Sequence, residues 1–247
     1  AAIHHHLGDY TASAEICYKL LAITEKSGDK YDKASCLLLL ANSFNRMKQS
    51  AKGIEYARQA APIIEQLTLP YEKASLLSEL ASRYLWSYQD TKIESFIDTA
   101  EFYTRAQLEI GRKEGFISII GKGYNKMNGY AHERNDFSSA LKYVDSSIYL
   151  FEKAGNRTQL ATSYGDKADI LMEMKNYKEA RRYADSCLSL HLQNKNPELI
   201  ANSYALLYQI SNNAENYKDA VWAMNEYLTI NDSLTAVEKS NKINELE

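Results

Sequence analysis

The feature that most constrains the fold of this chain is a pattern of small and aromatic residues that repeats every 40 positions. In one set of marks, a small residue precedes an aromatic residue by three positions. These pairs are Ala81/Tyr84, Gly121/Tyr124, Ala161/Tyr164 and Ala201/Tyr204. A second small residue recurs with the same step, at Ala100, Ala140, Ala180 and Ala220. Two independent sets of marks with one period indicate tandem copies of a single structural unit.

The N-terminal part of the chain carries the same pattern with one offset. Ser13 and Gly53 continue the second set of marks at a step of 40, but Gly53 lies 47 residues before Ala100. Seven extra residues are almost two helical turns, so an insertion of this length keeps the same helix face inward. We expect the insertion near a helix end within residues 54–80, or alternatively within residues 85–99.

Each unit is predicted to form two helices, because its apolar residues follow the three- and four-residue spacing of an amphipathic helix. Gly28 and Gly155 can adopt the left-handed conformation that closes a helix. Pro70 and Pro197 suit a first helical turn, with Asn196 as the N-cap before Pro197. The chain has only 3 Pro and 10 Gly in 247 residues, which is too few for a turn-rich all-β fold.

These residues resemble the tetratricopeptide repeat (TPR). A first helix carries a small residue three before an aromatic one, and a second begins with Asn-Tyr-x-x-Ala-x-x-Tyr at residues 176–183. The period is 40 rather than the family's 34, so each helix should be about one turn longer. The resemblance implies an all-α, right-handed superhelix, or solenoid, of about six helical hairpins plus a C-terminal helix.

The predicted TPR-like domain covers residues 1–233. Its six units are expected at 1–28, 29–68, 69–111, 112–155, 156–195 and 196–232. Residues 234–247 are expected to begin a C-terminal linker or capping helix, through which a homodimer could form. The 40-residue variety is similar to sensor regions of bacterial signalling regulators with a histidine kinase or helix-turn-helix output. The module would be periplasmic if a membrane-linked output domain followed, and cytoplasmic otherwise.

The first helices of stacked hairpins are expected to line a groove that suits an extended peptide or a partner helix. The predicted groove residues are Asn42, Arg46, Ser82, Trp86, Gln89, Lys122, Asn125, Lys126, Asp166, Asp169, Asn202 and Gln209. Asn and Gln side chains can pair with a peptide backbone, and Lys122 and Lys126 lie one turn apart, where both could face a ligand carboxylate. The carboxylate-clamp pattern of the TPR family is not clearly matched, so a C-terminal-peptide ligand is not implied. A solvated wall without a ligand is the alternative.

Signals for catalysis, metals and nucleic acids are weak. His132-Glu133 begins like a zinc-protease motif, but Asp136 occupies the place of its second histidine, and the consecutive histidines at 4–6 cannot share one metal well. Cys17 and Cys187 lie among apolar residues and are expected to be buried and inert. Lys and Arg number 29 against 32 Asp and Glu, which is not the basic footprint of a nucleic-acid binder. The longest apolar run has six residues, far short of a membrane span.

Three functions remain after these considerations. The chain can be a sensor or scaffold module that binds a peptide or protein and reports to an output domain. It can be a structural self-assembly module, held by its convex face or terminal helix without a groove ligand. An enzyme has the least support, because no nucleophile, base or metal set converges in the sequence. We therefore expect no enzyme, no cofactor, no metal and no nucleic acid bound through this region.

Overall fold

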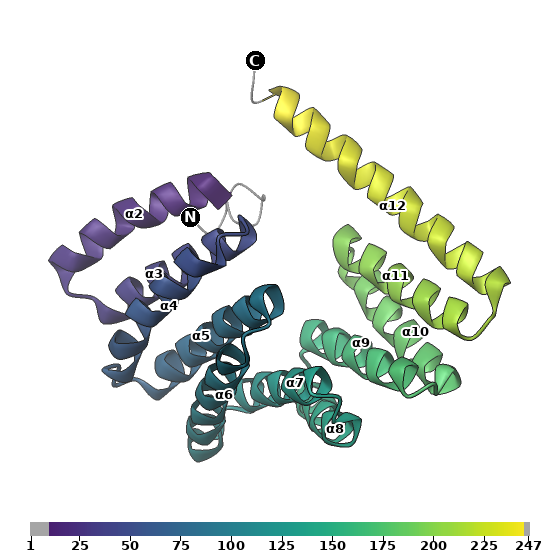
Figure 1. Cartoon of the computed structure of the whole chain (residues 1–247), viewed down its shortest axis with the longest axis horizontal. Helices are drawn as coiled ribbons and strands as arrows, with labels where there is room; N and C mark the ends of the chain where they lie inside the picture. Colours follow the sequence, from purple (N-terminus) through teal and green to yellow (C-terminus); the bar gives the residue numbers. More distant parts are fainter. Residues whose placement is uncertain (1–9, 245–247) are drawn as a thin grey trace. The chain divides into compact units, whose positions relative to one another are not determined.

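The computed structural model describes residues 10–244, and these residues form eleven helices and no strand (Figure 1). The helices are α2 (Tyr10–Ser27), α3 (Lys30–Arg46), α4 (Ser50–Glu65), α5 (Pro70–Thr91), α6 (Glu94–Glu114), α7 (Ile117–Glu133), α8 (Phe137–Ala154), α9 (Arg157–Glu173), α10 (Tyr177–Asn194), α11 (Pro197–Asn213) and α12 (Tyr217–Asn244). The predicted all-α class is therefore confirmed.

The chain divides into two compact units, residues 1–130 and 131–247, and the division falls inside α7. In the N-terminal unit α2 packs on α3, α4 lies against α3 and α5, and α6 packs on α5. In the C-terminal unit α8 packs on α9, α10 lies against α9 and α11, and α12 packs on α11. The alternate helices α3 and α5 also touch, as do α9 and α11, which is the contact that stacked hairpins make. The single predicted domain over residues 1–233 stays a prediction.

The helix ends follow the predicted capping chemistry. Gly28 and Gly155 have φ angles of 73° and 65°, in the left-handed region. Asn196 caps α11 by accepting a hydrogen bond from the backbone N–H of Leu199, and Pro197 lies in the first turn. Other N-cap side chains accept from the backbone N–H three residues on in the same way. These are Asp29, Asp136, Asn156 and Asn176.

Two left-handed caps that lie 40 residues apart offer a matched test of this backbone requirement. Gly155 and Lys195 have φ angles of 65° and 52°, and a Cβ at Gly155 would meet no neighbouring atom. Gly155→Ala is expected to destabilise the chain by about 1 kcal/mol through backbone strain alone. Lys195→Gly relieves the same strain and is expected to stabilise by a smaller amount, because glycine loses more entropy on folding. Urea unfolding measures both, and a shift in the same direction for both would contradict the assignment.

The seven extra residues lie in the α5/α6 hairpin, next to its turn at Lys92. First helices begin at residues 30, 70, 117, 157 and 197, so the step is 40 except between 70 and 117, where it is 47. Helix α5 has 22 residues where α3 has 17, and α6 has 21 where α8 has 18. Because α5 begins 40 residues after α3, and α6 ends 40 residues before α8 ends, the additions are at the inner helix ends. The insertion therefore falls within residues 85–99, and the placement within 54–80 was wrong.

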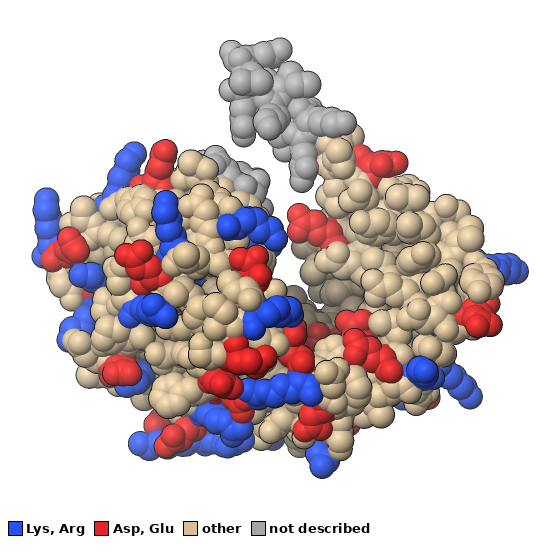
Figure 2. All heavy atoms as spheres, in the orientation of Figure 1, with Lys and Arg blue, Asp and Glu red and all other residues tan. Residues whose placement is uncertain are grey.

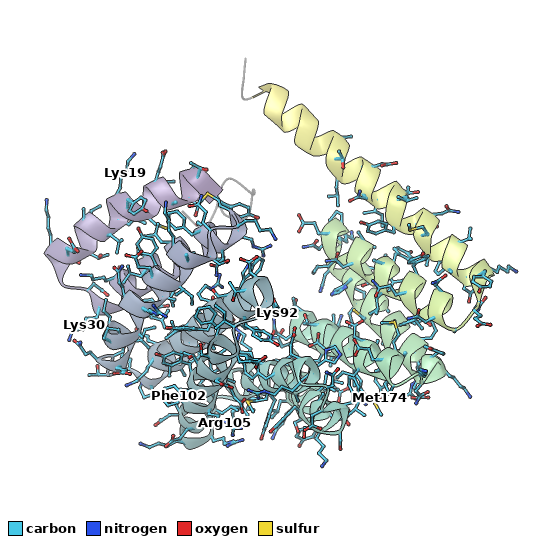
Figure 3. All side chains as sticks on the ribbon, in the orientation of Figure 1. Lys19, Lys30, Lys92, Phe102, Arg105 and Met174 are labelled. Atoms are coloured by element: carbon cyan, nitrogen blue, oxygen red, sulfur yellow. The ribbon has the colours of Figure 1, made fainter. Side chains whose placement is uncertain are left out.

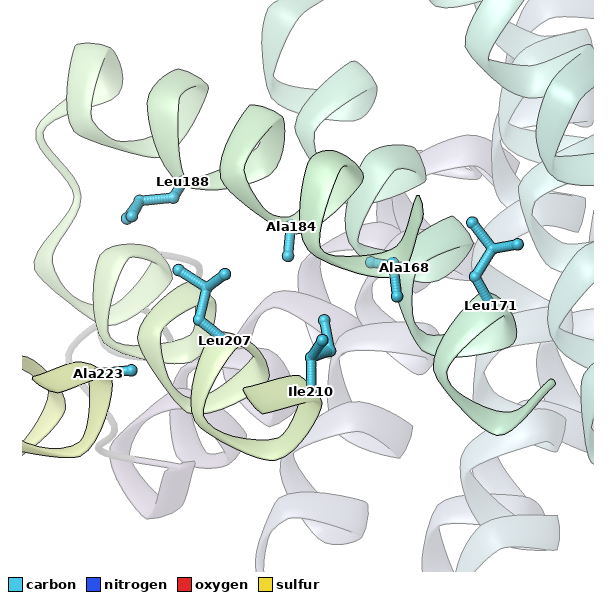
Figure 4. Close-up of a cluster of buried hydrophobic side chains, with 8 residues drawn as sticks. Ala168, Leu171, Ala184, Leu188, Leu207, Ile210 and Ala223 are labelled. Atoms are coloured by element: carbon cyan, nitrogen blue, oxygen red, sulfur yellow. The ribbon is translucent and has the colours of Figure 1, made fainter. Parts of the chain in front are cut away.

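Small residues and branched aliphatic residues alternate in the core of the C-terminal unit. One cluster joins α9, α10, α11 and α12, and Figure 4 shows its members along these helices. It consists of Ala168, Leu171, Ala180, Ala184, Leu188, Leu207, Ile210 and Ala223. The alanines allow close approach of the helices, while leucine and isoleucine fill the space between successive layers. This cluster is shared by the α9/α10 and α11/α12 hairpins, so α9 and α11 are held side by side.

Candidate functional site

The twelve predicted groove residues all lie on the first helices of their hairpins. In the N-terminal unit, Asn42 and Arg46 are on α3, Ser82, Trp86 and Gln89 on α5, and Lys122, Asn125 and Lys126 on α7. In the C-terminal unit, Asp166 and Asp169 are on α9, and Asn202 and Gln209 on α11. All twelve are partly or fully exposed. Their role in binding stays a prediction.

The N-terminal unit brings several of these side chains into direct contact. The guanidinium of Arg46 lies over the indole ring of Trp86, with its carbon 4.4 Å from the ring centroid. The ammonium group of Lys126 donates a hydrogen bond to the hydroxyl of Ser82. Residues from α3, α5 and α7 thus form one polar and aromatic face.

Glu79 and Arg83 belong to the same face, although the sequence analysis missed them. Arg83 Nη2 lies 3.1 Å from Glu79 Oε2, one helical turn away on α5. Burial lowers the pKa of Arg83, Glu79 opposes this effect, and the nearby charge of Arg46 adds to it. Arg83 was not among the predicted groove residues, but a long arginine side chain can bring its charge onto a neighbouring helix face.

The charges on this face are unbalanced. The Glu79 carboxylate acts on Arg83 and Lys126, whereas Arg46 adds a positive charge near Arg83, and Lys122 adds one near Lys126. Burial lowers the pKa of Lys126 to about 8, Glu79 acts in the opposite direction, and Arg83 and Lys122 lower it further. The Lys126 ammonium is therefore held among like charges, with a neutral hydroxyl as its hydrogen-bond partner.

The first-helix face of the C-terminal unit has the opposite character. Burial raises the pKa of Asp169 to about 6, with His132 lowering it and Glu173 raising it. His132 Nε2 lies 3.3 Å from Glu173 Oε1, without the alignment of a hydrogen bond. The predicted groove residues of α9, Asp166 and Asp169, are both acidic. This face suits cationic or neutral groups rather than anions.

Within the described part of the chain, no three His, Cys, Asp or Glu side chains are placed to share a metal ion. The three histidines at 4–6 lie outside the described residues. No helix there combines the length and the apolar character needed to cross a bilayer. On the surface visible in Figure 2, Lys and Arg are interspersed with Asp and Glu over the N-terminal unit.

The cysteines singled out from the sequence are buried. Cys17 and Cys187 are 0% and 4% exposed. Cys187 Sγ lies 3.6 Å from both His191 Nδ1 and Ser203 Oγ, and these two atoms lie 2.7 Å apart. Burial raises the pKa of Cys187 and lowers the pKa of His191, so both groups are favoured in their neutral forms. The trio resembles a nucleophile with its base, but it is a polar contact inside the α10/α11 junction.

No protein-family model matches the chain, and no curated protein matches it by sequence. Solved structures match its fold. BtubC (BKLC) from P. vanneervenii matches with a TM-score of 0.68 and 15% identity, over 95% of this chain and 93% of that one. A signal-transduction ATPase with a tetratricopeptide-repeat sensor, PH0952 from Pyrococcus horikoshii, matches with a TM-score of 0.60 and 15% identity. The chain has a tetratricopeptide-repeat fold.

A third TPR-type match is a Rap protein complexed with Competence and Sporulation Factor, with a TM-score of 0.64 and 15% identity. The match to the Rap protein covers 95% of this chain and 73% of that protein. The match to the P. horikoshii ATPase covers 95% of this chain and 44% of the ATPase. The predicted all-α solenoid of TPR-like hairpins is confirmed by these likenesses in fold. At these identities the likeness concerns the fold alone.

Proposed function

We propose that this TPR chain is a binding module whose first-helix faces take up a peptide or protein segment. The observation that carries the proposal is the stacked pair of Arg46 and Trp86 on the face of α3 and α5. Both side chains are accessible to solvent instead of filling the core. Tryptophan and arginine are the residue types that most often anchor protein interfaces.

The neighbouring structures support a ligand on this kind of fold. The Rap protein is described in a complex with Competence and Sporulation Factor, and the repeats of the P. horikoshii ATPase are described as a sensor. By this analogy the chain is the ligand-sensing or scaffolding part of a larger bacterial signalling regulator. We propose no catalytic role, since the one nucleophile-like trio described, at Cys187, is buried.

One observation favours the alternative of a self-assembly module. Helix α12 leaves Val221, Trp222 and Leu228 at 60%, 43% and 44% exposure. In a stacked-hairpin fold these apolar groups are on the last described helix, where a second copy could pack. Light scattering tests this alternative, which requires a dimer that Trp222→Glu disrupts and that substitutions on the first-helix face leave intact.

The binding function is tested by selecting peptides from a displayed random library on the whole chain and measuring their affinity by fluorescence anisotropy. Trp86→Ala is expected to weaken selected peptides about tenfold or more, because an interface tryptophan contributes about 2 kcal/mol. Phe102→Ala is the matched control. Phe102 is 63% exposed on the second helix α6 of the same unit, and Figure 3 labels it. A selection that yields no peptide, or peptides that tolerate Trp86→Ala, would contradict the proposal.

A further inference from the structure

The N-terminal unit places four cations on one face, and among the described residues only one of them has a carboxylate as an ion-pair partner. Arg83 is bonded to Glu79, but within residues 10–236 no carboxylate lies within ion-pair distance of Arg46, Lys122 or Lys126. These four cations and Trp86, from α3, α5 and α7, are called the basic cluster below. Exposed cations on a helix usually find a carboxylate one turn away at little cost, as Arg105 does with Glu101 on α6.

Lys126 is the strongest evidence for a missing partner. Its side chain is partly buried, Arg83 and Lys122 repel its ammonium, Glu79 attracts it from beyond ion-pair distance, and Ser82 supplies only a neutral hydroxyl. A buried ammonium is costly unless a carboxylate compensates its charge. An arriving carboxylate would supply that compensation, so the site is stabilised by the ligand that it would bind.

Arg46 supplies the directional element. The carbon of its guanidinium lies 4.4 Å from the ring centroid of Trp86, and an arginine that stacks on an aromatic ring keeps N–H groups at its edge for a ligand. A carboxylate can accept two parallel hydrogen bonds from that edge, and the partly exposed indole offers apolar contact to the stem of the same side chain. The same face thus offers a fork-shaped donor at Arg46 and a compact ammonium at Lys126, and a carboxylate can accept hydrogen bonds from either.

We propose that the basic cluster binds a side-chain carboxylate of an acidic peptide segment. The inference rests on the proposed binding function and names the chemistry of its ligand. A nucleic acid is disfavoured because the chain has a net charge of −3 and the corresponding face of the C-terminal unit is acidic at Asp166 and Asp169. Recognition is therefore local to one cluster of cations rather than spread along a phosphate track.

The first experiment compares acetylated and amidated peptides built from repeated Glu-Tyr-Ala, Gln-Tyr-Ala or Lys-Tyr-Ala. Blocked ends remove the terminal carboxylate, so only side chains can carry the charge. The Glu peptide is expected to bind about tenfold or more tighter than the Gln peptide, with the Lys peptide weaker still, and to weaken as salt rises. Equal affinity for the Glu and Gln peptides overturns the inference, as does tighter binding of inorganic phosphate or a single-stranded oligonucleotide.

The second experiment assigns the preference to the basic cluster. Lys126→Met and Arg46→Gln are each expected to reduce the Glu-over-Gln preference about tenfold, while Lys19→Met leaves it unchanged. Lys19 is exposed on α2, is labelled in Figure 3 and makes the same change in net charge. Circular dichroism melts verify that each variant is folded, and two variants on different helices guard against loss of folding in one. A preference that survives in both folded variants overturns the inference.

Failure of this inference and failure of the proposed function are distinguishable. If library selection yields peptides that Trp86→Ala releases but that carry no excess of Asp or Glu, the binding function stands and the carboxylate preference is wrong. If selection yields nothing and none of the three defined peptides binds, the binding function itself is wrong.

Discussion

Replacing Gly53 by alanine is expected to destabilise the N-terminal unit by about 3 kcal/mol, because α4 crosses α3 without room for a methyl group. A Cβ at Gly53 would lie 1.9 Å from Asn45 Oδ1 and 3.0 Å from the backbone oxygen of Ala41. The backbone oxygen cannot move without shifting α3, and Asn45 is fully buried. Urea unfolding followed by circular dichroism measures the loss as a lower midpoint.

Asn45→Ala supplies the control, because it removes the atom that the new methyl group would strike. Neither Oδ1 nor Nδ2 of Asn45 has a hydrogen-bond partner among the described residues. Its removal therefore relieves an unsatisfied buried amide while opening a small cavity, and the two effects largely offset each other. In that background Gly53→Ala is expected to cost less than 1 kcal/mol, a coupling of about 2 kcal/mol. Strict additivity of the two substitutions would show that the contact is not the cause.

The helix pairs and their caps could be predicted because each depends on residues close in sequence. Asn196 before Pro197 specifies a helix start without reference to the rest of the chain, and Gly155 specifies a helix end. The insertion could not be placed in the same way. Ala74 and Ala81 are both fully buried on α5, two turns apart on one face, so either fits the same repeat position. Only the helix bounds show that Ala74 is the fifth residue of its helix, as Ala34 is of α3.

The junctions between hairpins contain detail that a repeating pattern hides. One pair of facing positions is Ser147 and Ser163, whose hydroxyl oxygens lie 2.9 Å apart. The equivalent pair forty residues later is Cys187 and Ser203, and the equivalent pair forty residues earlier is Gln107 and Gly123. A Cβ on that glycine would come within 3.5 Å of Gln107 Nε2 and 2.6 Å of a Leu108 methyl carbon. The large residue is accommodated because its partner is the smallest one, a match that appears only when the two helices are seen together.

The candidate site was predictable in position but not in charge balance. Counting along the first helices found Arg46, Ser82, Trp86 and Lys126, because helical periodicity decides which Cα atoms share a face. It missed Arg83 and Glu79, whose ion pair determines how much positive charge is left over. Long charged side chains cross from one helix face to the next, so the sum of charges at a site needs the coordinates.

The stability of the C-terminal unit is expected to fall as the pH rises from about 4 to about 6, owing to Asp169. The pKa of this carboxyl group is about 6 in the folded chain and 3.8 in its ordinary state, mainly because burial disfavours the charged form. Between these values the folded state binds the proton more tightly than the unfolded state does. The stability that this group contributes is therefore fully present below pH 3.8. It is lost by the time the pH passes the folded pKa of about 6, a change of about 3 kcal/mol.

Asp169→Asn is expected to remove this dependence and to raise the free energy of unfolding near neutral pH by about 3 kcal/mol, since the amide has no charge to desolvate. Asp232→Asn, on the exposed surface of α12, makes the same change in charge and should alter neither the slope nor the midpoint. Urea unfolding at a series of pH values gives the slope, and a carbon-detected NMR titration of the Asp169 carboxyl gives its pKa directly. A decline of equal size in the Asp169→Asn variant would assign the pH dependence to other groups, because the proton that distinguishes the two states must then be bound elsewhere.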